Sequence, residues 1–334
     1  MTVEADRERT RIAIVDPLVG TVVDRRYRIE FRMAAGGFGA IYHVTHVISG
    51  RELALKILHA ELVADPDVVA RFRREGAALR SLRDPHTVKA VEHGEHDGLL
   101  YIAMELLQGE SLYERYTALG PLAWPRMVAI ARQVCSALGE AHGLGIVHRD
   151  LKPTNIHLEY VGGDPDYVKV LDFGIAKILH GSALPHADLT RIGTMVGTFD
   201  YMAPEALVGG ASGPTADLFT LGIVMYEMIS GERPFGDPQT PAEMLTAILN
   251  TKPPPLSSIS GAPVELDAVI DRCLDREPER RYQTAQELAT DLENVLALEA
   301  TNPTLAVTDD NTWTETVPLP RTTLPGVIAP KPRR

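Results

Sequence analysis

The apolar residues change their spacing once along this sequence, near Met104, and this change is the strongest constraint on the fold. From Tyr27 to Met104 they come in short runs typical of strands, and one helical stretch at 67–82 interrupts these runs. The runs are "YRIEFRM", "GAIYHVTHV", "ELALKIL", "TVKAVEHG" and "LLYIAMEL". Beyond them, helical spacing recurs near 127–142, 215–231, 241–250, 264–275 and 284–298. We therefore predict an α+β protein with a small β-rich lobe, carrying one main helix, and a larger helical lobe.

The composition limits the partners and the compartment. A formal net charge of −12 disfavours non-specific binding to nucleic acid or to an anionic membrane. The most apolar run, "LFTLGIVMYEMI" from Leu218 to Ile229, contains Glu227 and is too short to span a bilayer, so it predicts a buried helix. Because Cys135 and Cys273 are far apart in sequence and the amino end shows no signal peptide, we expect a cytoplasmic protein.

A glycine-rich stretch, "RMAAGGFGAIYHV", lies between two of the predicted strands. Gly36, Gly37 and Gly39 suit a backbone that folds closely over a phosphate. Ala34 stands where such loops usually begin with a glycine. If that position needs a positive φ, alanine costs about 1 kcal/mol or somewhat more, so we expect a working loop with weaker closure.

A charge pair is predicted between a strand and the helix of the small lobe. Lys56 ends the apolar run "LALK", and Glu75 lies between Phe72 and Leu79 on the apolar face of the predicted helix. A carboxylate buried on that face needs a cation. Lys56 is the obvious partner.

Two further segments carry oxygen ligands. In "IVHRDLKPTNIHL", Asp150 and Asn155 are five positions apart in a turn that contains Lys152 and Pro153. The run "VKVLDFG" then places Asp172 at the carboxyl end of a strand. Aspartate could simply form a turn there, but acidic and amide oxygens from two loops are what a phosphate-bound Mg²⁺ requires.

These motifs, followed in order by "GTFDYMAPE", resemble those of the eukaryotic-like serine/threonine protein kinases of bacteria. The resemblance covers about residues 20–298 and implies the bilobal protein-kinase fold. With the composition of the two ends, it gives five expected segments. These are a flexible arm at 1–19, an N-lobe at 20–104, a hinge at 105–110, a C-lobe at 111–298 and a disordered Thr- and Pro-rich tail at 299–334.

The resemblance implies transfer of the γ-phosphoryl group of ATP, with Mg²⁺ or Mn²⁺, to Ser and Thr hydroxyls of protein substrates, the chain itself included. Asp150 would accept the hydroxyl proton, and Lys152 would lie against the transferred phosphate. Asn155 and Asp172 would bind the metal ions. Thr198 would contact the catalytic aspartate and lysine.

The same resemblance implies a nucleotide site between the lobes. Gly36 and Gly39 would cover the phosphates, Lys56 would hold them while pairing with Glu75, and Met104 would guard the adenine pocket. Glu105 and Leu107 would supply the hinge hydrogen bonds. The full set of implied nucleotide-site residues is Met33, Gly36, Gly37, Gly39, Ile41, Ala54, Lys56, Glu75, Met104, Glu105, Leu107 and His157.

Several charges are implied to be architectural or regulatory. Glu205 would pair with Arg281, and Asp217 would anchor the catalytic turn from a buried helix. Arg149 offers a cation to a phosphorylated residue of the activation loop. The candidates for that phosphorylation are Thr190 and Thr194.

Two further departures from the family pattern remain. His157 replaces the usual apolar residue beneath the adenine, which predicts binding that is sensitive to acid pH. The stretch "LEYVGGDPDYVKV" lengthens a hairpin, in which Gly162, Gly163 and Pro165 predict a solvent-facing turn.

Three alternatives to a protein kinase stay open on the sequence. A pseudokinase scaffold would keep the fold without transfer, although the residues that carry transfer are present. A small-molecule kinase of similar fold fits less well with the "APE" segment. The threonines of the tail could instead dock phosphothreonine-binding domains, which would make the chain chiefly a partner.

Overall fold

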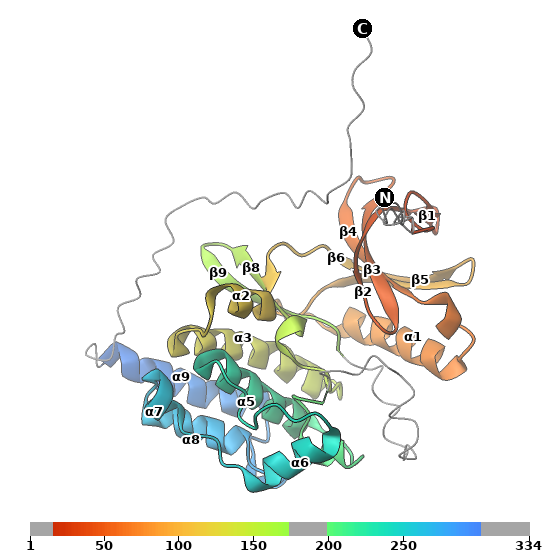
Figure 1. Cartoon of the computed structure of the whole chain (residues 1–334). Coiled ribbons are helices and arrows are strands. Elements are labelled where there is room, and N and C mark those ends of the chain that lie inside the picture. The colour runs from red at the N-terminus through yellow and green to blue at the C-terminus, as the bar shows by residue number, and fades with distance from the viewer. Residues whose placement is uncertain (1–15, 174–198, 302–334) are drawn as a thin grey trace, which may run out of the picture. The chain divides into compact units, whose positions relative to one another are not determined.

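The chain folds as a six-stranded antiparallel sheet with one main helix, followed by a mainly helical part (Figure 1). This computed structural model describes residues 16–173 and 199–301, with side chains as far as Leu298. The predicted arm and tail therefore lie almost entirely outside the described residues. The strand order is β1-β2-β3-β4-β6-β5. The bounds are β1 Val22–Val23, β2 Tyr27–Ala35, β3 Gly39–His46, β4 Glu52–Leu58, β5 Ala90–His96, β6 Leu99–Glu105 and helix α1 Pro66–Ser81.

Each of the five apolar runs became a strand, and the stretch at 67–82 became α1, so these predictions are confirmed. Because successive side chains of a strand point to opposite faces, apolar residues pack on both faces of the sheet. Tyr42 and Val44 of β3 enter one apolar cluster, whereas Ile41 packs against the larger core on the other side. Strand β1 was not predicted, because two residues are too few to show a period.

The folded region begins ahead of the boundary expected at residue 20. The hydroxyl group of Tyr42 donates to a carboxylate oxygen of Asp16 at 3.1 Å, and Arg32 lies 3.2 Å from the same carboxylate. Leu18 packs against the apolar cluster of the sheet. Residues 16–19 thus belong to the small lobe.

The larger lobe contains a three-stranded sheet, β7-β8-β9, which lies at the edge of the lobe and packs against two of its helices, α2 and α3 (Figure 1). Its strands are β7 Glu110–Ser111, β8 Ile156–Val161 and β9 Asp164–Val170. Its α-helices are α2 Leu112–Leu119, α3 Trp124–Gly143, α4 Pro204–Leu207, α5 Pro214–Ser230, α6 Pro241–Asn250, α7 Leu256–Ser260, α8 Val264–Cys273 and α9 Ala285–Thr301. The five helices predicted from the periodicity are α3, α5, α6, α8 and α9, within a few residues.

Helix α5 is buried in this lobe, as its apolar composition predicted. Between Ala216 and Ile229 it is buried at every position except Glu227. Helices α3, α7 and α8 pack around it. No helix in the described ranges has both the length and the apolar character needed to cross a bilayer.

The short helix α2 was not predicted, although a local signal for it exists. Ser111 and Glu114 form a capping box, in which the Ser111 hydroxyl accepts from the Glu114 amide and the Glu114 carboxylate accepts from the Ser111 amide. Eight residues are too few for a clear helical period. The capping box was therefore the better signal.

The lengthened hairpin joins β8 to β9 through a two-residue turn. Gly162 and Gly163 have φ values of 62° and 95°, as their position in the turn requires. Pro165 lies in β9 and not in the turn, which corrects the expectation that all three residues would form it. The tip is exposed, whereas Asp166 is buried and anchors the hairpin, because both Arg115 of α2 and Arg126 of α3 bind its carboxylate.

Candidate active site

The glycine loop connects β2 to β3 and closes on itself. The amide of Gly36 donates to the carbonyl oxygen of Gly39 at 2.8 Å. A side chain at Gly39 would bring its Cβ within 2.2 Å of the carbonyl oxygen of Ile57, so only glycine allows this close approach to β4. Ala34 pairs with Ile41 inside the sheet and does not have a positive φ. The conformational penalty considered for alanine therefore does not arise.

The residues implied to surround the adenine are brought together on one face of the sheet. Ala54 lies opposite Met104 in the register of β4 and β6, and both belong to the larger core. Ile41 and Leu107 pack against that same core while remaining partly exposed. Met33 differs, since 48% of it is exposed.

Lys56 bridges two carboxylates from different parts of the chain. Its Nζ lies 2.7 Å from Oε1 of Glu75 in α1, which confirms the predicted pair, and 2.8 Å from Oδ1 of Asp172. Glu75 is almost fully buried, as its position on the apolar face of α1 predicted. The bridge joins the sheet, the helix and the segment after β9 at one ammonium group.

The charges of this bridge shift one another's protonation. Burial alone would lower the pKa of Lys56, but the carboxylates of Asp172 and Glu75 more than offset it and raise the pKa. Burial raises the pKa of Glu75, and Lys56 offsets this only in part. Desolvation by itself would raise the pKa of Asp172 too, but the ammonium group of Lys56 more than offsets this, and the pKa is lowered. The cation and the Asp172 carboxylate are thus both held in their charged forms at neutral pH.

The turn between α3 and β8 contains Asp150, Lys152 and Asn155, and we call it the catalytic turn after the role that the resemblance implies. The ammonium group of Lys152 is 3.1 Å from Oδ2 of Asp150. The side-chain amide of Asn155 donates to the carbonyl oxygen of Asp150 at 2.8 Å and lies 3.3 Å from its Oδ2. The three predicted side chains are therefore neighbours.

His148 ties this turn to the segment of Asp172. Its Nε2 donates to the carbonyl oxygen of Leu171 at 2.9 Å, while its Nδ1 accepts from the amide of Asp150 at 3.3 Å. Full burial lowers the pKa of His148, so the imidazole is neutral and one nitrogen is free to accept. Its ring also contacts Phe173, with centroids 4.7 Å apart.

Asp217 anchors the turn from helix α5, as the resemblance implied. It is 1% exposed, and its two oxygens accept from the amides of His148 at 2.7 Å and Arg149 at 2.8 Å. Nε2 of His142 lies 2.8 Å from the same carboxylate. Arg149 and Asp172 both have positive φ values, 63° and 45°, which non-glycine residues hold only when their surroundings impose them.

Asn155 and Asp172 lie on adjoining segments, because the amide of Leu171 donates to the carbonyl oxygen of Asn155 at 2.9 Å, and their side-chain oxygens are of the kind that fits a divalent cation. Asp172 presents a charged carboxylate, and Asn155 uses its NH₂ group toward Asp150, which leaves its Oδ1 available as an acceptor. Carboxylate and amide oxygens are the donors that Mg²⁺ and Mn²⁺ prefer.

A second buried ion pair stabilises the lower part of the lobe. Arg281 has no exposed surface and binds Glu205 in a bidentate manner, at 2.8 and 2.9 Å. It also donates to the carbonyl oxygens of Asp275 and Thr215 and lies 4.8 Å from the ring centroid of Phe219. The predicted pair is thus confirmed as a structural element.

His157 lies on β8 at the hinge side of the site. Its Nε2 is 3.3 Å from the carbonyl oxygen of Gln108, and burial lowers its pKa. The ring is therefore neutral at neutral pH, which is compatible with a position beneath a nucleobase.

The sequence did not reveal a charged contact that holds the hinge. Oε1 of Glu105 accepts from Nζ of Lys169 and from the amide of Lys89, both at 2.9 Å. Lys169 is buried on β9, where it faces His157 in the strand register. A lysine three residues before the "DFG" motif was the only local signal, and its partner lies 64 positions away.

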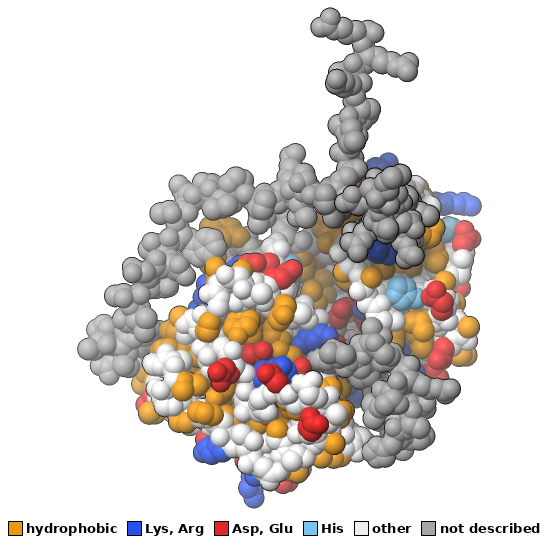
Figure 2. Space-filling model, viewed as in Figure 1, with side chains coloured by type: hydrophobic (Ala, Val, Ile, Leu, Met, Phe, Trp, Pro, Cys, Tyr) orange, Lys and Arg blue, Asp and Glu red, His pale blue; other side chains and the backbone are white. Residues whose placement is uncertain are grey.

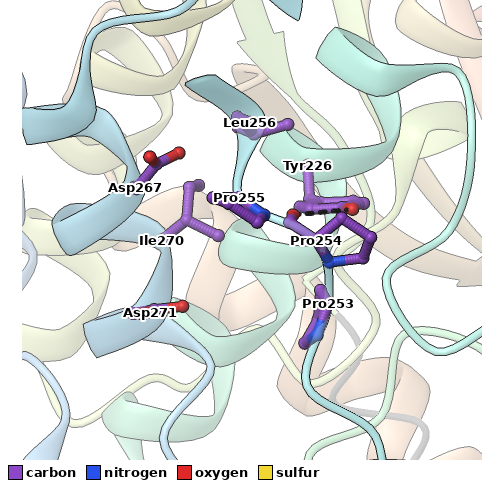
Figure 3. A pocket seen from close by; sticks show the side chains of 8 residues that line it. All are labelled: Tyr226, Pro253, Pro254, Pro255, Leu256, Asp267, Ile270 and Asp271. Carbon is purple, nitrogen blue, oxygen red and sulfur yellow. Dashed lines mark hydrogen bonds between the residues drawn. The ribbon is translucent and has the colours of Figure 1, made fainter. Parts of the chain in front are cut away.

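Some predicted positions lie outside the described residues, namely Thr190, Thr194 and Thr198. A small pocket elsewhere in the larger lobe contains none of the predicted site residues (Figure 3). It lies between α5, α8 and the segment 253–255, and the hydroxyl group of Tyr226 donates there to the carbonyl oxygen of Pro254.

Residues 27–292 match the family described as the protein kinase domain. Together with the fold and the lysine bridge, this match shows that the chain belongs to the protein kinase family. A crystal structure of the kinase domain of PknI from Mycobacterium tuberculosis is similar, with a TM-score of 0.63 and 26% identity, covering 83% of this chain and 98% of that one.

Named bacterial serine/threonine-protein kinases are similar in sequence. Pkn1 of Myxococcus xanthus is 39% identical over 282 residues, which is 84% of this chain and 40% of that protein. PknE of Mycobacterium bovis is 39% identical over 272 residues, covering 81% and 46%. PrkC of Bacillus subtilis is 31% identical over 303 residues, covering 90% and 45%. The chain therefore spans less than half the length of these curated relatives.

Proposed function

We propose that this chain is a serine/threonine protein kinase, which transfers the γ-phosphoryl group of ATP to Ser and Thr hydroxyls of proteins, including its own. The observation that carries the proposal is the bridge from Lys56 to Glu75 and Asp172, at 2.7 and 2.8 Å. A buried lysine fixed between two carboxylates presents one positive charge at a defined place, which suits the positioning of a nucleotide phosphate.

In the proposed reaction, the substrate hydroxyl oxygen attacks the γ-phosphorus, and the bond between this phosphorus and the β-γ bridging oxygen breaks to release ADP. The proton of the hydroxyl passes to the carboxylate of Asp150. Lys152, 3.1 Å from that carboxylate, stabilises the charge on the transferred group. Asp217 holds Asp150 in place through the two backbone amides that precede it.

Asp172 and Asn155 would hold the divalent cation, which neutralises negative charge on the phosphates when it is bound. Met33, Ile41, Ala54, Met104 and His157 would enclose the adenine. The hinge backbone at Glu105 and Leu107 would form its hydrogen bonds.

The test is the transfer of labelled γ-phosphate from ATP to the chain and to a generic basic protein. We expect incorporation on threonine and serine, lost in Asp150→Asn and kept in Asp97→Asn. Asp97 is a matched control because its side chain is 88% exposed and its positive φ suits asparagine. Absence of transfer by a folded, ATP-binding wild-type protein would instead support a pseudokinase scaffold. Repeating the assay with Mg²⁺ and then Mn²⁺ shows which of the two ions supports transfer.

Partners and regulation form a finer part of the proposal. A face with interspersed acidic and basic side chains is consistent with protein substrates (Figure 2). We propose that phosphorylation of Thr190 or Thr194 switches activity through Arg149, and that phosphorylated threonines of the tail recruit phosphothreonine-binding domains. The buried free thiols of Cys135 and Cys273 support a reducing compartment such as the cytoplasm. Mass spectrometry of the autophosphorylated chain tests the threonine assignments.

A further inference from the structure

We propose that His59 is a positioning residue, which fixes the glycine loop in the conformation that receives the phosphates of ATP. His59 directly follows strand β4 and lies 23 positions from the loop residue that it contacts. This inference rests on the proposed function, because it assigns a role within the same nucleotide site.

His59 holds the loop at two points. Its Nε2 lies 2.8 Å from the carbonyl oxygen of Gly36, and its backbone amide donates to the carbonyl oxygen of Phe38 at 3.0 Å. A carbonyl oxygen only accepts, so Nε2 must carry the proton of this bond. The two contacts lie on either side of Gly37, and together they restrain the tip of the loop.

The loop has few other restraints. Residues 36–38 are exposed, and a side chain added at Gly36 or Gly37 would meet no atom closer than 3.8 Å. Because glycine has no Cβ, both residues can adopt several backbone conformations at similar energy. The contact with His59 selects one of these conformations.

The position of His59 itself is well fixed. The preceding residue, Leu58, is buried and pairs with Gly39 in the strand register. The carbonyl oxygen of His59 accepts from the amide of Leu62. This hydrogen bond begins a 3₁₀ turn at Ala60–Leu62. The imidazole therefore extends toward the loop from a rigid backbone.

This arrangement suits phosphate binding for an electrostatic reason. In the described chain, the amides of Gly37 and Phe38 donate to no backbone carbonyl, so they remain free for phosphate oxygens. The carbonyl oxygen of Gly36 would repel a phosphate, and the hydrogen bond from the imidazole engages one of its lone pairs and partly offsets its negative charge. Loss of the imidazole would release both the loop and this carbonyl group.

The experiment compares the affinities of the full-length protein for ATP and for adenosine by titration calorimetry. His59→Ala should weaken ATP binding by about three- to tenfold, the loss expected for one hydrogen bond, and leave adenosine binding unchanged. His59→Gln should restore much of the ATP affinity, since its amide NH₂ can replace Nε2. His46→Ala is the matched control, because His46 lies at the opposite end of β3, where its imidazole contacts Ser49 and the ring of Tyr27 and not the glycine loop.

Equal ATP affinity in the wild type and His59→Ala would overturn the inference, as would an equal loss for ATP and adenosine. If the alanine variant does not fold, the same comparison in His59→Leu, which keeps bulk without a donor, decides the question. A folded wild type that binds no ATP would overturn the proposed function, and this inference with it. If the wild type binds ATP and the variants bind it equally well, only the inference about His59 is overturned, and the proposed function stands.

Discussion

Replacing Asp217 with asparagine should disable the catalytic turn while the protein stays folded. In the wild type, one carboxylate oxygen accepts from the amide of His148 and from Nε2 of His142, and the other accepts from the amide of Arg149. Asparagine has a single acceptor oxygen. If this oxygen keeps the first two bonds, the NH₂ group faces the amide of Arg149, and two donors meet in a buried place.

The size of the effect follows from these contacts. A buried donor without an acceptor costs about 1–3 kcal/mol. The positive φ of Arg149 itself costs about 1–3 kcal/mol in a residue with a side chain, so the turn relaxes once the bond is lost. Because about 1.4 kcal/mol corresponds to a tenfold change in rate, displacement of Asp150 by this relaxation should lower phosphoryl transfer at least tenfold.

Two measurements on Asp217→Asn test this reasoning. Calorimetry should show a melting temperature lowered by roughly 2–5 °C, the shift that about 1–3 kcal/mol produces in a domain of this size. The initial rate of labelled phosphate transfer should fall as stated, with Asp97→Asn unaffected as a control for the chemical change. A folded Asp217→Asn variant that retains transfer within about twofold of the wild type would refute the role of Asp217, since 0.4 kcal/mol is too little for an orphaned buried donor.

Two further predictions concern helix α1. Burial raises the pKa of Glu75. As the pH falls, Glu75 is therefore protonated, and loses its ion pair with Lys56, at a pH above its ordinary pKa of 4.5. ATP affinity, measured by calorimetry from neutral pH downward, should therefore show an acid limb above pH 4.5 that is absent in Glu75→Gln. Because its pKa is raised, the folded chain binds this proton more tightly than the unfolded chain does. As the pH falls, the free energy of unfolding of the wild type relative to Glu75→Gln should therefore increase, and this gain should be lost as the pH rises through the raised pKa. A decrease of both the ATP affinity and this relative stability as the pH falls would contradict the assignment. Gly76→Ala should lower kcat/KM, because the added Cβ would lie 2.8 Å from Cβ and Cγ of His93 and push α1 away from β5, although alanine alone favours a helix by about 1 kcal/mol. Combining it with His93→Gly should recover much of the activity in a double-mutant cycle, and unchanged kinetics in Gly76→Ala would show that this contact does not position the helix.

The sequence predicted most of the elements because each carries its own period. Strand β4 and helix α6 were predicted to the residue, and α5 was identified as buried from its uniform apolar composition. The capping box that begins α2 and the two-residue strand β1 were missed, since short elements show no period. For such elements, local capping chemistry is more informative than spacing.

The residues of the site could also be named in advance, but for a different reason. Lys56 and Glu75 were paired on physical grounds, because a carboxylate on the buried face of a helix requires a cation. The roles of Asp150 and Asn155 came from the resemblance of the motifs and stay predictions until transfer is measured.

Only the tertiary structure decided the contacts between distant segments. Asp172 reaches Lys56 across 116 positions, Lys169 reaches the hinge across 64, and the imidazole of His59 reaches the glycine loop across 23. Each contact depends on strand register and helix packing, which a single sequence does not fix because the period of an element is local and its neighbours in space are not. The backbone conformation of Ala34 was also decided only by the tertiary structure. Ala34 pairs inside the sheet without a positive φ, so the strain considered for alanine at this position is absent.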